Sequence, residues 1–505
     1  MTKPNILIFM TDQQRASSVL PGDPYKAKTP VLDAFRQDSV TFSRTFCPSP
    51  HCCPSRASFM TGLMPTQHGV WHNVNVANAI TRGMKSHIRP WSVDLREAGY
   101  HMLFTGKWHV SNDQQPCDYG WEQVYPEHAC QGMGMSREAQ DAEALVREHR
   151  KAISQGDLQR EGKRSPGEIQ RPGLPPYIHY GDSSHPDLAP FFRDGAEDNP
   201  FGDRTVVDAA LARMDTLGDD EPWCMYVGTL GPHDPYIVPK RFLELYEGME
   251  FALPDTFDDP MDDKPGLYRR TRDRFHQLSR EEHQEAIRHY LAFCTYEDWL
   301  FGRLIDKLKE RGEYEDTIVL YLSDHGDYLG DHGLWCKGLP SFLSCYHVPA
   351  IVKMPGGQQG VVCDELVSLC DFGPTFLEMG SAQSPVAFAG HSLMPLLEGN
   401  APAQWRDALF FQTNGNETYG IQRSVVTDRW RFVYNGFDYD ELYDLASDPG
   451  QMLNLARDPE HGPVVEQMYR RIWDFGLAHD EHLLNGYIMT AMADYGPGIA
   501  TSPQS

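Results

Sequence analysis

Four short apolar segments, each followed at once by polar residues, constrain the fold of this chain more than any other feature. These segments are Asn5–Met10, Tyr100–Thr105, Trp223–Leu230 and Thr317–Leu322. Short apolar runs without alternation are typical of strands that are buried on both faces of a mostly parallel sheet. Helical patterns lie between them, at Val31–Phe35, Val206–Met214 and Glu281–Lys309. Alternating strands and helices predict a doubly wound α/β fold, in which ligands bind beyond the carboxyl ends of the strands.

The polar residues after these strands are therefore the first candidates for a functional site. They are Asp12-Gln13, Gly106-Lys107-Trp108-His109, Gly231-Pro232-His233-Asp234 and Asp324-His325. Asp12 and Asp324 are strand-end carboxylates that can converge on a hard divalent cation. Each Asp also suits a helix N-cap, and a lone strand-end His or Lys is more often a structural or solvated residue.

Two regions outside these strands differ in character from the rest and indicate how the chain is divided. Residues 112–204 are rich in Pro, Gly and acidic residues, and we expect an insertion there that shapes the substrate entrance. Trp430–Tyr434 followed by Asn435-Gly436 predicts an antiparallel strand and turn. We expect a catalytic α/β domain at 1–384, a smaller α+β domain with an antiparallel sheet at 385–478, and a tail at 479–505. The tail is either a frayed end or an oligomerisation arm, of which we favour the arm.

Charge and composition exclude several classes of protein. The 505 residues include 45 Lys and Arg against 71 Asp and Glu, a net charge of −26 that disfavours nucleic acid and anionic membrane surfaces. The longest apolar run near the N-terminus, Ile6–Met10, is too short for a signal peptide or a membrane span. The 11 Cys follow no disulfide spacing, so we expect mostly reduced thiols in a cytoplasmic protein.

The sharpest local motif is Cys52-Cys53-Pro54-Ser55-Arg56, continued by Thr61-Gly62. Pro54 suits the first turn of a helix, so Cys52 is expected at a helix N-terminus, where the dipole lowers a thiol pKa. Alone, the segment also fits a capped helix start with two buried thiols, or a plain thiol nucleophile.

The motif resembles the C-x-P-S-R signature of the type I sulfatases, within the alkaline phosphatase superfamily, with Cys53 as the x residue. Three further segments resemble that family in chain order. They are Gly106-Lys107-Trp108-His109, Pro232-His233-Asp234-Pro235-Tyr236, and Lys337 after Gly330-Asp331-His332-Gly333. The resemblance extends from Asn5 to about Ala456 and implies a sulfatase-like fold.

The resemblance implies a sulfuric ester hydrolase that cleaves a sulfate monoester of an aryl, alkyl or small carbohydrate alcohol through a covalent sulfo-enzyme intermediate. It implies that a formylglycine-generating enzyme oxidises Cys52 to formylglycine. The implied catalytic residues are Cys52, Arg56, Lys107, His109, His233 and Lys337. The implied ligands of one divalent cation, Ca²⁺, Mn²⁺ or Mg²⁺, are Asp12, Cys52, Asp324, His325 and Gln13. On the substrate side we expect Lys107, His233, Lys337, Trp108 and Asn73.

The chain departs from the family pattern at Gln13, where a second acidic ligand is usual, and at Gln451, which replaces another acid. The missing carboxylate leaves a mixed oxygen and nitrogen ligand set, which suits Mn²⁺ at least as well as Ca²⁺. The closest alternative is a phosphonate monoester or phosphodiester hydrolase of the same superfamily, which shares the oxidised Cys and the Asp/His metal set. Those enzymes tend to lack the strand-end Lys and His, so Lys107 and His109 favour sulfate.

Two alternatives come from other classes. A non-catalytic oxyanion-binding relative would keep Cys52 as a thiol. A plain Cys-His thiol hydrolase would leave Asp12, Asp324 and both lysines without a role.

Overall fold

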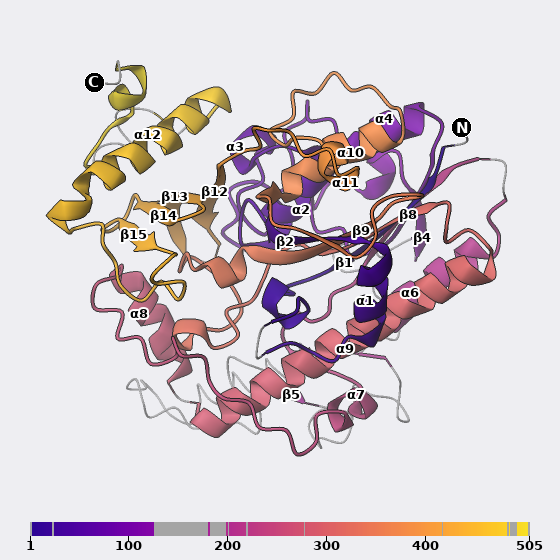
Figure 1. Cartoon of the computed structure of the whole chain (residues 1–505), viewed down its shortest axis with the longest axis horizontal. Coiled ribbons are helices and arrows are strands. Elements are labelled where there is room, and N and C mark those ends of the chain that lie inside the picture. The colour runs from indigo at the N-terminus through magenta and orange to yellow at the C-terminus, as the bar shows by residue number, and fades with distance from the viewer. Residues whose placement is uncertain are drawn as a thin grey trace.

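The computed structural model describes most of the chain (Figure 1). The described residues are 3–22, 25–125, 180–181, 198–199, 201–218, 221–276, 278–416, 418–481, 484 and 492–502. Much of the insertion expected at 112–204, and part of the tail at 479–505, therefore lies outside the described residues. Within the described ranges, no helix combines the length and apolar character that a membrane span requires.

Among the described residues, nine strands form one central sheet in the order β10-β2-β9-β8-β1-β6-β3-β4, with β11 also paired to β2. Their bounds are β1 Asn5–Thr11, β2 Val40–Phe46, β3 His101–Gly106, β4 Glu122–Tyr125, β6 Trp223–Gly228, β8 Thr317–Ser323, β9 His347–Lys353, β10 Val361–Cys363 and β11 Val367–Ser368. The four segments expected to be buried strands are β1, β3, β6 and β8. They are adjacent and parallel, and β9 runs antiparallel to both of its neighbours. The expectation of a mostly parallel sheet is therefore confirmed.

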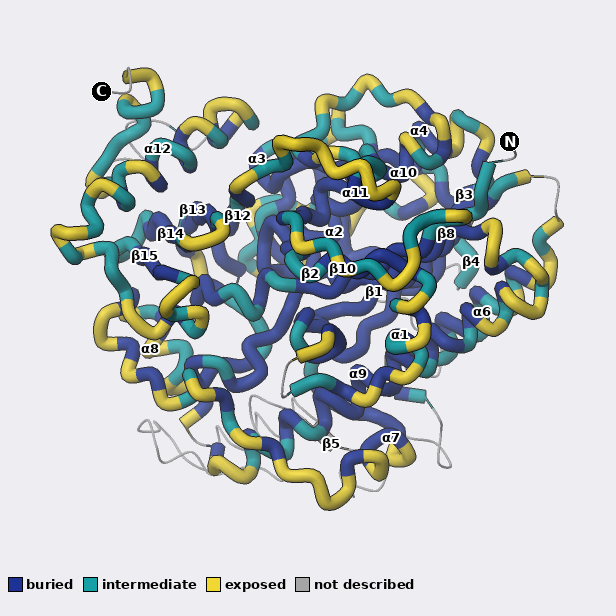
Figure 2. The backbone as a smooth tube through the Cα atoms, viewed as in Figure 1, coloured by how far each residue is buried: buried dark blue, intermediate teal, exposed yellow. Residues whose placement is uncertain are grey.

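Helices cover both faces of this sheet (Figure 1). Their bounds are α1 Pro30–Phe35, α2 Cys52–Thr61, α3 Pro65–His68, α4 Trp91–Glu97, α6 Asp203–Met214, α7 Lys240–Glu244, α8 Gly266–Arg272, α9 Arg280–Glu310, α10 Phe372–Met379 and α11 Met394–Leu397. Successive side chains of a strand point to opposite faces. Along β1, Ile6 and Ile8 join the core shared with α2, α4 and α10, whereas Leu7 and Phe9 join the core shared with α1, α6 and α9. Figure 2 shows the resulting buried centre.

The longest helix, α9, has a clear start signal in the sequence. The Ser279 hydroxyl accepts a hydrogen bond from the Glu282 amide at 3.2 Å, and the Glu282 carboxylate accepts one from the Ser279 amide at 2.7 Å. This capping box satisfies two amides that have no partner within the helix. The helix predicted at Glu281–Lys309 is confirmed.

A four-stranded antiparallel sheet follows, in the order β12-β13-β14-β15. Its elements are β12 Ala408–Gly415, β13 Tyr419–Thr427, β14 Trp430–Asn435 and β15 Glu441–Asp444, and helix α12 spans Gly462–Ala478. Tyr469 and Trp473 of α12 pack on Phe432 and Tyr434. The expected antiparallel sheet is confirmed, whereas the domain boundary near residue 385 stays a prediction. A separate two-stranded sheet pairs β5 Tyr180–Gly181 with β7 Tyr236–Ile237.

The described residues of the tail pack on their own chain. The Glu481 carboxylate accepts hydrogen bonds from Arg423 at 2.7 and 3.3 Å, and the pair is buried. The Tyr495 carbonyl accepts the indole N–H of Trp473 at 2.8 Å. An oligomerisation arm stays a prediction.

Candidate active site

The carboxyl ends of β1 and β8 bring two acidic residues together. The two strands pair in register, with Thr11 opposite Ser323, so Asp12 and Asp324 follow at the same level. The amide of Asp324 donates to the Thr11 carbonyl at 3.2 Å, which continues the ladder one residue further. Both Asp side chains are fully buried. Burial without a partner would disfavour two adjacent carboxylates, so this position requires compensating charge.

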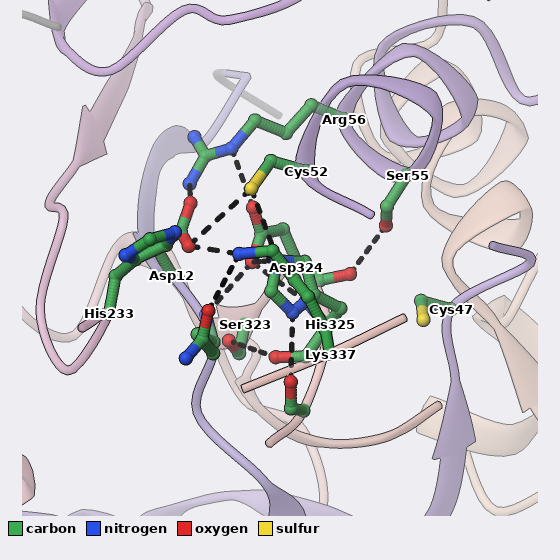
Figure 3. Close-up of polar contacts among 12 residues, drawn as sticks. Asp12, Cys47, Cys52, Ser55, Arg56, His233, Ser323, Asp324, His325 and Lys337 are labelled. Atoms are coloured by element: carbon green, nitrogen blue, oxygen red, sulfur yellow. Dashed lines mark hydrogen bonds and ion pairs between the residues drawn. The ribbon is translucent and has the colours of Figure 1, made fainter. Parts of the chain in front are cut away.

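Helix α2 supplies Cys52 at its first position and points it at the two carboxylates (Figure 3). Cys52 Sγ lies 3.2 Å from His325 Nε2 and 3.7 Å from Asp12 Oδ1. The other ring nitrogen of His325, Nδ1, donates to the Gly326 carbonyl at 2.9 Å. This hydrogen bond orients the ring so that Nε2 faces Cys52 and the two carboxylates. The ligand atoms of Asp12, Cys52, Asp324 and His325 all lie within 4.8 Å of one another, the one such cluster among the described residues.

This donor set fits a divalent cation. Two carboxylates and an imidazole nitrogen converge on one buried position, and the side chain of residue 52 completes the group. Hard or borderline cations such as Ca²⁺, Mn²⁺ and Mg²⁺ accept oxygen and imidazole ligands. The four residues are those that the resemblance to the sulfatases implied, apart from Gln13.

Arg56 lies one helical turn after Cys52 and bridges the two carboxylates (Figure 3). Its Nε donates to Asp324 Oδ2 at 2.7 Å and its Nη2 donates to Asp12 Oδ2 at 3.0 Å. Nη1 donates to the Tyr226 hydroxyl at 2.9 Å. A planar guanidinium matches this geometry, which a lysine could not reproduce.

Two lysines add positive charge around Cys52. Lys107 follows β3 and donates from Nζ to Asp12 Oδ2. Burial opposes ionisation of the Cys52 thiol, but Lys107, Lys337 and His325 lower its pKa well below the ordinary value. Burial likewise opposes ionisation of Asp12, and the charges of Lys107, His233 and Arg56 nevertheless hold its pKa well below the usual range.

His109 and His233 reach the same edge of the sheet from different segments. His109 Nε2 hydrogen-bonds the Asn75 side-chain oxygen at 3.1 Å, whereas its buried Nδ1 has no hydrogen-bond partner among the described residues. Burial and the charge of Lys107 lower the pKa of His109 to about 4. Although burial and Lys337 oppose protonation of His233, Asp234 raises its pKa, aided by Cys52.

Gln13 connects the site to a further acid. Its Oε1 accepts from Lys337 Nζ at 2.6 Å, and its Nε2 donates to Asp327 Oδ2 at 2.6 Å and to Asp234 Oδ1 at 3.3 Å. The acids on the Nε2 side fix the amide so that its oxygen faces Lys337. The side chain is engaged in this network, and its role as a metal ligand stays a prediction.

Two residues expected on the substrate side have hydrogen bonds within the protein. Trp108 is 1% exposed, and its indole N–H donates to the Gln114 carbonyl at 3.0 Å. The Asn73 side-chain oxygen accepts from the Cys53 amide at 3.1 Å and so caps the start of α2. Substrate binding by Trp108 and Asn73 stays a prediction.

Three residues near the site were missed in the sequence. Tyr226 lies within β6 and resembles any other buried strand residue, and Asn75 lies in an irregular segment. Only Asp327 had a usable signal, because it follows Asp324 and His325 at the end of the same strand. These three contact Arg56, His109 and Gln13 respectively.

Comparison with known proteins gives consistent matches. Residues 4–381 match the family model described as Sulfatase, and residues 330–476 match the one described as N-sulphoglucosamine sulphohydrolase, C-terminal. The choline-sulfatase of Rhizobium meliloti is 27% identical over 500 residues, which cover 94% of this chain and 87% of the relative. The arylsulfatase of Clostridium perfringens is 25% identical over 520 residues, 97% of this chain and 99% of the relative.

Solved structures share the fold. A phosphonate monoester hydrolase from Silicibacter pomeroyi superposes with a TM-score of 0.73 at 24% identity, covering 96% of this chain and 97% of the other. A protein solved in complex with its substrate D-glucosamine-2-N,6-O-disulfate gives a TM-score of 0.72 at 19% identity, covering 95% and 99%.

Proposed function

The chain belongs to the sulfatase family of sulfuric ester hydrolases, and we propose that it hydrolyses a sulfate monoester of an aryl, alkyl or small carbohydrate alcohol to the alcohol and inorganic sulfate. One observation carries this proposal. The Cys52 side chain lies at the start of a buried helix, beside His325 and Asp12, within a set of cations formed by Arg56, Lys107 and Lys337. A tetrahedral monoanion bound there would meet several positively charged donors.

We infer that a formylglycine-generating enzyme oxidises Cys52 to formylglycine. We further infer that Asp12, Asp324, His325 and the side chain of residue 52 hold one divalent cation, Ca²⁺, Mn²⁺ or Mg²⁺. When bound, the cation supplies Lewis-acid stabilisation, and the hydrated aldehyde supplies an oxygen nucleophile. Gln13 is the remaining candidate ligand.

Arg56 and Lys107 are proposed to supply positive charge, Arg56 to the carboxylates and Lys107 to the substrate. Arg56 donates to Asp12 and to Asp324 and so holds both carboxylates in one orientation. Lys107 contacts Asp12 from the end of β3, and its ammonium is available to stabilise the charge on the sulfate oxygens as the S–O bond to the alcohol breaks.

Two groups are proposed to move protons. The departing alcohol oxygen needs a proton, and Lys337 or His233 can donate it as the general acid. His109 is the proposed base toward the side chain of residue 52. With a pKa of about 4 it is neutral at pH 7, and the side chain of residue 52 lies within hydrogen-bonding reach of its ring. Release of sulfate requires a base of this kind.

The second candidate is hydrolysis of a phosphonate monoester or phosphodiester. The pairing of Asp12-Gln13 with Asp324-His325, and the shared fold with a phosphonate monoester hydrolase, support some activity of this kind. Lys107 and His109 both lie at the site and favour sulfate as the main substrate.

The relatives suggest which alcohols to test first. Their names include a choline-sulfatase, an arylsulfatase and an N-acetylglucosamine-6-O-sulfatase. Choline sulfate, an aryl sulfate and a 6-O-sulfated aminosugar therefore form a panel that spans cationic, aromatic and carbohydrate leaving groups.

The oxidation state of residue 52 tests the nucleophile directly. We expect mass spectrometry of the active protein to find the aldehyde, or its hydrate, in the peptide that contains Cys52 and Cys53. Fragmentation should place the change on residue 52 alone. An unmodified Cys52 in fully active protein would contradict this part of the proposal.

A further inference from the structure

Two buried carboxyl groups, Asp203 and Glu297, face the segment that follows β6. Asp203 is the first residue of α6, Glu297 lies within α9, and both are fully buried. Asp203 accepts the amides of Leu230 at 2.8 Å and Gly231 at 2.9 Å, and the side-chain amide of Asn199 at 2.6 Å. Burial raises the pKa of Asp203 to about 6, but these donors favour its ionised form, which therefore still predominates at neutral pH.

Glu297 has different surroundings. No hydrogen bond of ordinary geometry reaches either of its carboxyl oxygens from a described residue, although the Thr229 hydroxyl and the Asp203 carboxyl group both lie within reach of one. The charged side chains that act on it most strongly, Asp203 and Asp198, are both acids, and the Thr229 hydroxyl faces it as well. Burial, reinforced by Asp203, raises the pKa of Glu297 well above its ordinary value. A carboxylate in such a position is unstable, whereas a neutral carboxylic acid can donate one hydrogen bond.

The Glu297 carboxyl group also lies directly against the backbone. A Cβ atom on Gly231 would meet Glu297 Oε1 at 2.1 Å, so no larger residue fits there without a shift. The Gly231 carbonyl accepts the Asp12 amide at 3.0 Å, and the Thr229 amide donates to the Met10 carbonyl at 3.0 Å. The segment Thr229–Gly231, which contacts Glu297, is therefore also hydrogen-bonded to the end of β1.

We propose that Glu297 is a neutral carboxylic acid in the folded enzyme and donates its O–H to the Asp203 carboxylate, so that the pair clamps the segment Thr229–Gly231. Asp203 in turn holds the amides of Leu230 and Gly231. The clamp fixes the Gly231 carbonyl, which accepts the Asp12 amide, and it fixes the start of the loop that contains His233. Glu297 is a positioning residue, and only its effect on turnover rests on the proposed function.

Infrared spectroscopy tests the protonation without reference to activity. Burial also raises the pKa of Asp298 and Asp440 to about 7, so both can contribute a C=O stretch at neutral pH. We therefore expect the difference spectrum, wild type minus E297Q, to show the C=O stretch of one protonated carboxylic acid. Glu281→Gln is the matched control, because Glu281 is an exposed acid on the same helix, and this variant should keep the band. Absence of the band from this difference spectrum, or an equal band in the spectrum of wild type minus Glu281→Gln, would overturn the proposal.

Turnover tests the clamp. Glutamine at 297 keeps the shape and a donor, so E297Q should retain kcat within about threefold, whereas Asp203→Asn presents a donor to two amides and should lower kcat by more than about tenfold. KM should change less than kcat in both, and circular dichroism checks that both fold. If E297Q lost as much turnover as D203N, an ionised Glu297 would be required and the proposal would fail. A wrong substrate assignment would leave the infrared result unchanged.

Discussion

Cys52 and Cys53 are neighbours in the chain with opposite electrostatic surroundings. Burial is the strongest influence on Cys53 and raises the pKa of its thiol well above the ordinary value. At Cys52, the nearby lysines overcome the effect of burial and lower the pKa of the thiol. Cys53 Sγ instead accepts the Val74 amide at 3.3 Å. We therefore expect Cys52→Ala to lose roughly 10⁴-fold or more in kcat/KM, the scale of removing a nucleophile.

Cys53→Ala is the matched control, because it deletes an equally buried thiol one residue away. It should keep turnover within about threefold and lose only modest stability. Steady-state kinetics and thermal unfolding of both variants check this pair. Near-wild-type rates from Cys52→Ala would exclude residue 52 as the nucleophile.

Asn75 fixes the orientation of His109 through a single hydrogen bond. The Asn75 side-chain oxygen accepts a hydrogen bond from the Nε2–H group of His109. The other ring nitrogen, Nδ1, then carries the lone pair and can act as a base. We expect Asn75→Ala to lower kcat by about tenfold, within the range for weakening one general base. In a His109→Ala background the same change should cost nothing further. Equal losses in both backgrounds, measured by kcat, would show that Asn75 acts by another route.

The site could be predicted as far as its residues belong to contiguous motifs. Cys52 and Arg56 lie on one motif, and Asp12 and Asp324 end two recognisable strands. Tyr226 was not predictable, because its hydroxyl reaches Arg56 from a strand whose pattern reads only as buried core. The orientation of the Gln13 amide was equally hidden, since it depends on Asp327, 314 residues further along the chain.

At the level of elements, the four adjacent parallel strands of the central sheet could be predicted, but the other strands and the strand order could not. Buried parallel strands have distinct apolar runs, which is why β1, β3, β6 and β8 were found. The antiparallel β9 and the edge strands β10 and β11 are short or flanked by loops, and their pairing depends on contacts distant in sequence. Long-range pairing leaves no local pattern.

The carboxyl ends of β3 and β6 approach closely at Gly106. A Cβ there would meet the Gly228 carbonyl oxygen at 1.9 Å, and that oxygen also accepts the Lys107 amide at 2.9 Å. Gly106→Ala should therefore displace Lys107 and lower kcat/KM by about tenfold or more, besides costing some stability.

Gly99→Ala separates this packing effect from backbone strain. Gly99 and Gly106 both have positive φ, +95° and +89°, but nothing lies within 4 Å of a Cβ at Gly99. Gly99→Ala should lose about 1–2 kcal/mol of stability and keep its activity. The same loss of kcat/KM in both variants would rule out the contact with Gly228 as the cause.

At the scale of the whole molecule, the antiparallel sheet supports the site from outside. The Asn416 side-chain oxygen accepts the Asn73 amide at 2.9 Å, and Asn73 caps α2. Arg423 lies 4.9 Å from the Trp71 ring and forms a buried ion pair with Glu481 of the tail. The tail is thus connected through Arg423 to the segment before Asn73.

Glu481→Ala tests this connection. It would leave the Arg423 charge buried without its carboxylate, which typically costs about 3–5 kcal/mol. We expect a clearly lower Tm and reduced kcat. Asp407→Ala, which breaks the more exposed ion pair to Arg471, should change Tm far less. Equal shifts in Tm for the two variants would show that the tail contributes no more than a surface pair.

The proposed enzyme prefers a sulfate monoester to the phosphonate monoester and the phosphodiester of the same alcohol. The most direct measurement compares kcat/KM for one aryl leaving group carried as sulfate, as phosphonate monoester and as phosphodiester, on protein verified to be oxidised at Cys52. The presence of Lys107 and His109 beside Cys52 predicts that the sulfate is hydrolysed most efficiently. A preference for the phosphonate or the diester would contradict that claim and leave the proposed nucleophile and metal ligands in place.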